Sequence, residues 1–177
     1  MTRTPLILAT LALSLLLSGC GSRSIGNKID DQFIDPEVSA NISRAHADLT
    51  SPSSHIVVTS YNGVVLLAGQ TPRSELKVAA EQAARKVQGV SKVHNELQVL
   101  QPTSVLARSN DSLLTAKVKA QMLADSSVPG SRIKVVTENG IVYLLGLVTH
   151  LEANHATSLV QSVSGVQKIV KLFQYTD

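Results

Sequence analysis

The stretch "YNGVVLLAGQTPRSELKVAAEQAARKVQGVSKV" (61–93) carries the signals of two strands, a helix and a third strand in a fixed order. Asn62-Gly63 stands between two β-rich runs, and this dipeptide accepts positive φ at both central positions of a tight turn, so it predicts a β-hairpin. The next segment has an apolar stripe at helical spacing, ends at Gly89 and leads into another apolar run. These signals predict a β-β-α-β unit with a right-handed crossover before its last strand.

The same unit occurs a second time as "ENGIVYLLGLVTHLEANHATSLVQSVSGVQKI" (138–169). The corresponding positions are Asn62-Gly63 with Asn139-Gly140, Gly69 with Gly146, and Gly89 with Gly165. The first two pairs are 77 residues apart and the last pair 76, so one residue is lost within the second helix. Because a repeat at fixed spacing marks a repeated structural unit, the sequence predicts two copies of one fold.

A helix is predicted before each hairpin, over "DPEVSANISRAHADL" (35–49) and "NDSLLTAKVKAQMLAD" (110–125). Each repeat is then α-β-β-α-β over roughly 65 residues. A three-stranded sheet needs its apolar face covered, and two helices can cover it. We therefore predict an α+β protein of two tandem domains, each a three-stranded mixed sheet packed by two helices.

The only cysteine, Cys20, follows a leader-like segment. Arg3 precedes an uncharged, leucine-rich run over residues 6–17, and small residues follow, which is the layout of a secretory signal peptide. The run is shorter than the ~20 residues that span a bilayer. "LSGC" (17–20) resembles the lipobox of bacterial lipoproteins. That resemblance implies lipidation of Cys20 after cleavage and, with Gly21 following, sorting to the outer membrane.

The αββαβ repeat with "NGxVxLxG", an alanine-rich helix and "GV" resembles the BON domain. Two copies behind a lipobox are similar to the dual-BON outer-membrane lipoproteins of Gram-negative bacteria. The expected organisation is a signal peptide (1–19), a lipidated polar tether (20–34), a first BON domain (35–100), a linker (101–110) and a second BON domain (111–177). We expect a monomer anchored by Cys20 on the periplasmic face of the outer membrane.

Signals for catalysis are weak in this sequence. His150 and His155 are five residues apart, so their rings point about 140° apart on a helix, and zinc-binding helices need a spacing of four. The other three histidines are scattered, and no nucleophile elbow or phosphate loop occurs. A net charge of +3 is too small to indicate nucleic-acid binding. We predict no catalytic residue, no metal site and no cofactor.

The first helix of the second repeat has more apolar residues than a core requires. Leu114, Val118 and Met122 form a core stripe, and a second apolar line runs beside it with two lysines on the helix. This second line consists of Leu113, Ala120 and Ala124, with Lys117 among them and Leu123 beyond it. Surplus apolar surface with lysines suits an anionic lipid interface. The alternative is that this line packs against the first domain.

Charge favours the second repeat as the lipid-facing one. Residues 30–101 hold six Lys/Arg and eight Asp/Glu, whereas residues 111–177 hold six and five. The resemblance implies that the first helix of the second domain binds anionic phospholipid, although relatives carry tryptophan where this chain has Leu113. It also implies a role in outer-membrane integrity and, in some relatives, enrichment at the division site. The alternative function is an adaptor for envelope proteins, such as barrel assembly or peptidoglycan remodelling, that uses the same helix.

Overall fold

The computed structural model describes residues 25–177, so the predicted signal peptide and Cys20 lie outside the described residues. The first domain consists of α1 (Ile25–Ala45), the 3₁₀ turn η1 (Ala47–Leu49), β1 (His55–Tyr61), β2 (Val64–Thr71), α2 (Ser74–Ala84), β3 (Lys92–Asn95) and β4 (Gln98–Val99). β1 is antiparallel to β2, and β3 and β4 are both parallel to β2. The helix α2 is the crossover that the parallel pairing requires.

The second domain repeats this order with an uninterrupted third strand. It consists of α3 (Val105–Ala124), the 3₁₀ turn η2 (Gly130–Arg132), β5 (Ile133–Glu138), β6 (Ile141–Val148), α4 (His150–Gln161) and β7 (Lys168–Tyr175). β6 is the central strand, antiparallel to β5 and parallel to β7. The predicted α+β class and the tandem αββαβ order are confirmed.

The Asn-Gly dipeptides form the hairpin turns as predicted. Asn62 and Gly63 have φ of 52° and 75°, and Asn139 and Gly140 have φ of 52° and 72°. Positive φ at both central positions is the requirement of a type I′ turn, whose twist matches that of the flanking strands. The turn residues thus set the register of both hairpins.

The third strand of the first domain differs from the prediction because it is divided into β3 and β4. The division lies beside Gly69 of β2, which has φ of 119° and a position where any Cβ would collide with the carbonyl oxygen of His55. Gly146, its equivalent in β6, lies outside the positive-φ region, and β7 beside it is continuous. The first sheet therefore has four strands and the second has three.

The central strands are apolar on both faces, and both faces are buried. In β2, Val65 and Leu67 pack under the helices of their own domain, whereas Leu66 and Ala68 face the second domain. This division follows from the alternation of side chains along a strand. The second domain contributes Tyr143 and Leu145 of β6, the positions equivalent to Leu66 and Ala68, and Tyr61 and Leu172 complete the cluster.

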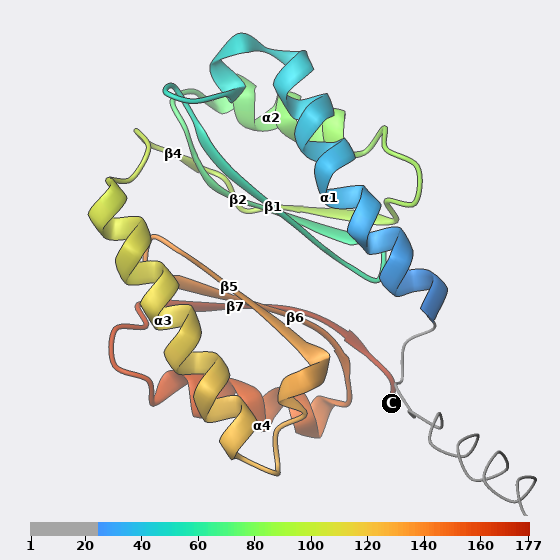
Figure 1. The fold of residues 1–177 in the computed structure, drawn as a ribbon, viewed down its shortest axis with the longest axis vertical. Coiled ribbons are helices and arrows are strands. Elements are labelled where there is room, and N and C mark those ends of the chain that lie inside the picture. The colour runs from blue at the N-terminus through green and yellow to red at the C-terminus, as the bar shows by residue number, and fades with distance from the viewer. Residues whose placement is uncertain (1–24) are drawn as a thin grey trace, which may run out of the picture.

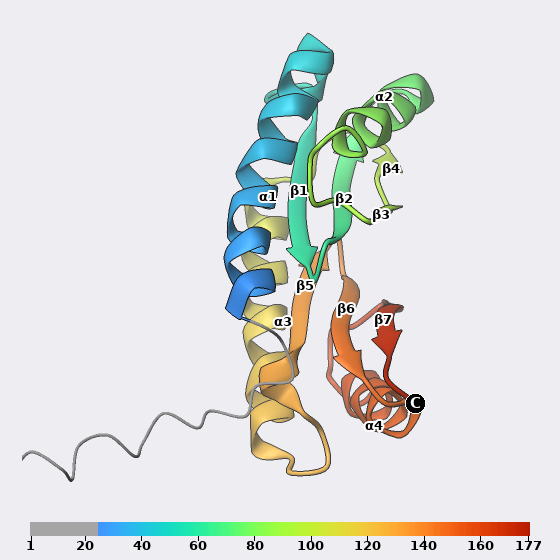
Figure 2. The same cartoon turned by 90° about the vertical axis from the view of Figure 1, so that its right-hand side faces the viewer.

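The two sheets therefore pack against each other, with one helix pair outside each sheet (Figure 1). Figure 2 shows α1 and α3 on one side of the molecule and α2 and α4 on the other. Burial in this interface raises the pKa of Tyr143 to about 12. Each large side chain buried here contributes roughly 1.5–3 kcal/mol, so the two domains form one packed body.

Polar contacts surround this apolar interface. The Gln70 amide donates to the buried Glu138 carboxylate over 2.9 Å, and the same carboxylate lies 3.5 Å from His55 Nε2. The Tyr61 hydroxyl donates to the Arg132 carbonyl over 2.8 Å. Buried polar groups need hydrogen-bond partners, and here the partners lie in the other domain. The same bonds therefore fix the relative position of the two domains.

Both predicted connecting segments are partly helical, which corrects two predictions. The tether expected over residues 20–34 is helical from Ile25, and the linker expected over residues 101–110 gives way to α3 at Val105. Ser104 supplies the reason for the second start, since its side chain caps α3 by accepting from Ala107 N over 3.2 Å. Among residues 25–177, no helix is long and apolar enough to cross a membrane.

Candidate functional site

Helix α3 is held to its sheet by one face. Leu114, Val118 and Met122 recur at helical spacing and belong to the core of the second domain. Asp111 extends the same face and is also buried. Its two carboxylate oxygens accept from the backbone N–H groups of Asn139 and Gly140 over 2.8 and 2.9 Å, which ties α3 to the hairpin turn.

The opposite face of α3 is apolar and exposed. We call its apolar residues the outer stripe. They are Val105, Leu106, Leu113, Ala116, Ala120, Leu123 and Ala124, and the exposed Ser109 lies among them. At about 100° per residue these side chains lie within an arc of about 100°. Leu113 and Leu123 are 62% and 70% exposed, and Val105 and Leu106 are 71% and 72% exposed. The outer stripe therefore covers nearly the whole helix, about 30 Å long.

Two lysines flank the outer stripe. The helical spacing puts Lys117 beside one edge and Lys119 beside the other, and both are exposed. The single acidic residue within α3, Asp111, is buried on the opposite face. The exposed face of α3 thus combines leucines and alanines with cations and carries no negative charge.

All five residues predicted for lipid contact lie exposed on α3: Leu113, Lys117, Ala120, Leu123 and Ala124. The alternative that this line packs against the first domain is wrong, because the domains meet through Leu66, Tyr143 and the other sheet residues of the interface. Val105 and Leu106 were not predicted as part of this face, because they lie in the expected linker. Their signal was the Ser104 cap followed by apolar residues in phase with Leu113 and Leu123.

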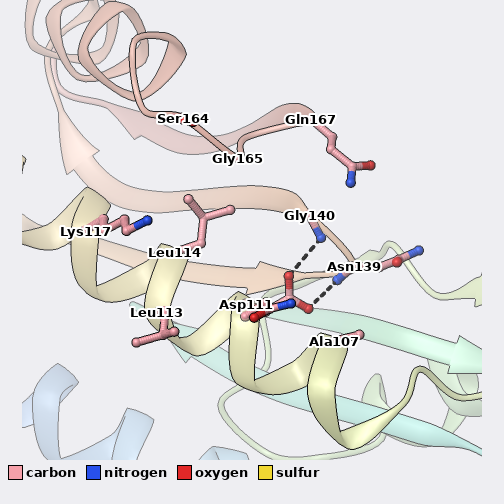
Figure 3. Close-up of a pocket in the computed structure, with 11 residues that line it drawn as sticks. Ala107, Asp111, Leu113, Leu114, Lys117, Asn139, Gly140, Ser164, Gly165 and Gln167 are labelled. Carbon is pink, nitrogen blue, oxygen red and sulfur yellow. Dashed lines mark hydrogen bonds between the residues drawn. The ribbon is translucent and has the colours of Figure 1, made fainter.

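A cavity of about 330 Å³ lies beside the outer stripe. Figure 3 shows α3 on one side of it and the segment from Ser164 to Gln167 on the other, with the Asn139-Gly140 turn at its end. Leu113 and Lys117 line this cavity and also belong to the exposed face of α3. A ligand in the cavity would therefore touch the same helix as a ligand on the outer stripe.

The histidines of the second domain are occupied by structural contacts. His150 and His155 are exposed on α4, as expected for surface residues. His150 Nδ1 lies 2.8 Å from the Asp177 carboxylate and lowers the pKa of that group, and the ring stacks on Tyr175 at 3.8 Å. Across the described part of the chain, no group of three His, Cys, Asp or Glu could hold a metal ion.

The fold and the exposed helix define a class: two αββαβ modules packed sheet to sheet, with an apolar and cationic helix on the surface of the second. The chain belongs to the BON domain family, whose model matches residues 31–101 and 110–177. These ranges contain both repeats, and the resemblance inferred from the Asn-Gly and Gly-Val motifs is confirmed.

Three similar proteins cover most of this chain. "Outer membrane lipoprotein DolP" of Haemophilus influenzae is 41% identical over 155 residues, which is 88% of this chain and 79% of the relative. "21 kDa hemolysin" of Actinobacillus pleuropneumoniae is 35% identical over 86% of this chain and 78% of its own length. "Osmotically-inducible protein Y" of Escherichia coli is 32% identical over 82% of this chain and 72% of its own length.

Proposed function

We propose that this protein is a non-enzymatic outer-membrane lipoprotein whose second domain binds anionic phospholipid through α3 and thereby supports the integrity of that membrane. The observation that carries the proposal is the outer stripe, in which Leu113 and Leu123 are exposed between two lysines. Apolar side chains enter the boundary of the acyl region while lysines meet lipid phosphates. The printed name of the relative from Haemophilus influenzae supports the outer-membrane location.

The anchor in this proposal is Cys20, held in the inner leaflet with the two domains in the periplasm. Several acyl chains on one residue exceed what stable anchoring needs, so α3 adds lipid recognition to an attachment that already exists. Mass spectrometry of the mature N-terminus tests the anchor. A mature chain that begins at Cys20 and carries acyl chains is expected, and an unmodified Cys20 would exclude it.

The lipid contact is tested by vesicle co-sedimentation of residues 21–177, which contain both cores and the interface between the domains. We expect binding to vesicles that contain phosphatidylglycerol and none to phosphatidylcholine alone. Leu113→Asp replaces an inserted side chain by a charge that anionic lipid repels, so we expect at least about a tenfold loss of binding. Because Leu113 is exposed, the variant should fold normally.

Phe33 of α1 provides a matched control. Ile34 lies beside Gly89 as Leu114 lies beside Gly165, so Phe33 holds the place of Leu113 in the first domain. It is 67% exposed. Phe33→Asp should leave vesicle binding unchanged. Equal losses in the two variants would contradict a specific role for α3, and no vesicle binding by the unaltered chain would favour the adaptor function.

A further inference from the structure

A hollow of about 270 Å³ lies in the first domain, between α1 and the open edge of β1. Figure 2 shows α1 running alongside this strand. We propose that this space, which we call the β1 groove, binds an extended peptide segment of a partner protein. The segment adds a strand to β1 and places one aliphatic side chain in the hollow. No residue of α3 lines the β1 groove, so this site is separate from the lipid-binding helix.

The open edge of β1 has backbone groups that an added strand can use. Within residues 25–177, β1 pairs with β2 alone. The His55 carbonyl points at β2, whereas the Ser60 carbonyl points away from β2 and accepts from the Lys134 ammonium over 3.1 Å. Because backbone groups alternate along an antiparallel strand, Ile56 and Val58 face outward like Ser60. Strand addition needs outward N–H and C=O groups of this kind, since the added main chain pairs with them.

The hollow lies beside these two outward-facing residues and suits an aliphatic side chain. Its floor consists of Ile42, Leu49, Ile56 and Val58. Serine and threonine hydroxyls of α1 and of the segment between η1 and β1 surround this floor, and no Asp, Glu, Lys or Arg of the described residues lines it. A volume near 270 Å³ is at the lower end for small-ligand pockets. The β1 groove therefore favours a leucine, isoleucine or valine side chain over a charged one.

The second domain already occupies one end of the space between α1 and β1. The Lys134 ammonium lies 3.8 Å from the Asp35 carboxylate of α1 and also meets the Ser60 carbonyl of β1. This contact continues the interface between the sheets, in which Tyr61 of β1 is buried. Residues 59–61 are buried, whereas residues 55–58 are only partly buried. The β1 groove thus extends an interface in which a side chain already meets α1 and an outward carbonyl of β1 together.

The corresponding segment of the second domain packs directly against its helix. Gly130 of η2 lies so close to α3 that an added Cβ would be 2.8 Å from the Met122 carbonyl oxygen. Met122 is the equivalent of Ile42, eight residues after the equivalent pair Leu114 and Ile34. We therefore expect strand addition in the first domain and not at β5.

The test selects phage-displayed random heptapeptides on residues 21–177. We expect the selected peptides to share an aliphatic residue at one position, and its replacement by alanine to weaken binding about tenfold. Binding should shift the backbone amide NMR signals of Ile56 and Val58. N-methylation of alternate peptide residues should abolish binding, whereas N-methylation of the residues between them should have little effect, because only one set of N–H groups faces β1.

Ser39→Trp closes the β1 groove from the side of α1 and should abolish peptide binding. Ser39 lines the hollow and is exposed, so the variant should fold normally. Ala45→Trp is the matched control, since Ala45 is exposed on the same helix but lies outside the hollow. The proposal is overturned if no peptide is selected, if the selected peptides bind the Ser39→Trp variant unchanged, or if N-methylation shows no alternation.

A second copy of this chain is the other occupant that an open strand edge admits. Analytical ultracentrifugation should show a monomer for the unaltered chain and for both tryptophan variants. A dimer that Ser39→Trp converts to a monomer would assign the β1 groove to contact between copies and would overturn the peptide proposal. Vesicle binding through α3 is measured separately, so failure of the peptide site leaves the proposed function standing.

Discussion

Helices α1 and α3 hold equivalent places in the two domains, and their outer faces carry different side chains. The contacts of Ile34 and Leu114 with equivalent glycines set an offset of 80 residues between the helices. This offset pairs Phe33 with Leu113, Glu37 with Lys117, Ser43 with Leu123, and Arg44 with Ala124. Glu37, Ser43 and Arg44 make the outer face of α1 charged and polar at three of these pairs, where α3 has Lys117, Leu123 and Ala124, and only the pair of Phe33 with Leu113 is apolar in both helices. Packing constrains the inner faces alike, so the difference on the outer faces reflects function.

The sheets show the converse relation. Leu66 and Tyr143 hold equivalent positions on β2 and β6, and both are buried between the domains. Ala68 and Leu145, two residues further along each strand, are also equivalent and also buried between the domains. The repeats therefore use the same strand face to pack on each other, and this leaves the helices outward. The interface covers the second apolar face of the two central strands, β2 and β6, whereas nothing in the described residues covers the outer face of α3.

The largest expected effect is a difference in stability between alanine substitutions at the equivalent glycines Gly69 and Gly146. Gly69→Ala places a Cβ against the His55 carbonyl at a positive φ, so we expect the free energy of unfolding to fall by about 3–5 kcal/mol. At Gly146 the added Cβ would lie 3.0 Å from the Arg132 carbonyl with ordinary φ, so a loss of about 1 kcal/mol is expected. Urea denaturation of both variants measures the difference. Equal losses would show that the conformation of Gly69 is not what divides β3 from β4.

The next effect concerns the outer faces of the helices. Lys117→Glu with Leu123→Ser gives α3 the residues of α1, which removes a cation and an apolar side chain from the lipid surface. We expect binding to phosphatidylglycerol vesicles to weaken by about 3 kcal/mol, or on the order of 100-fold. Both positions are exposed, so the midpoint of unfolding should not move.

The reciprocal change sharpens this result. Glu37→Lys with Ser43→Leu gives α1 the residues of α3 at positions that are also exposed. Vesicle binding should increase, because the altered α1 gains an apolar and cationic outer face that the unaltered helix lacks. If the first pair of changes has no effect on binding, the contrast between the helices has no bearing on lipid.

Much of this fold is predictable because its signals are local. Asn-Gly turns, helix-stopping glycines and alternating apolar residues each act over a few residues, and they occur twice. Both first helices were predicted to start too late. α1 begins at Ile25 rather than at Asp35, and α3 begins at Val105, after the Ser104 cap, where Pro102 had indicated a linker. The sheet-to-sheet interface was missed although both faces of "VVLLA" (64–68) are apolar, because the sequence does not say what covers the second face.

Only part of the candidate site was predictable from the sequence. The residues from Leu113 to Ala124 were found because their apolar line exceeds what one core needs. The cavity was not found, because Ser164 and Gln167 reach α3 only through the fold. Asp111 likewise gives no signal in the sequence that its oxygens bind a turn 28 residues away.

The smallest expected effect is on the pH dependence of stability, and it concerns the N-terminal caps of α2 and α4, the second helix of each domain. Thr149 and Glu152 form a capping box at the start of α4, whereas Arg73, which precedes α2, makes no side-chain cap. The backbone N–H of Thr149 lowers the pKa of Glu152, and Arg132 lowers it further. A carboxylate whose pKa is lower in the folded chain stabilises it above the unfolded pKa, and this contribution is lost as pH falls through the folded pKa.

Glu152→Gln isolates that contribution, since glutamine also serves in a capping box but carries no charge. We expect the variant to lose at most about 1 kcal/mol at neutral pH, given the partial exposure of the pair with Arg132. Its stability should fall less steeply than that of the unaltered chain as the pH drops below about 5. Glu75→Gln in α2 is the matched change. The pKa of Glu75 is also lowered, by its own backbone N–H and by Arg73, but its side chain is 66% exposed against 24% for Glu152, so its replacement should alter the pH profile less. Thermal unfolding of the three proteins across this range would contradict the assignment if the Glu152 and Glu75 variants followed the same profile, because the cap of α4 would then contribute nothing that α2 lacks.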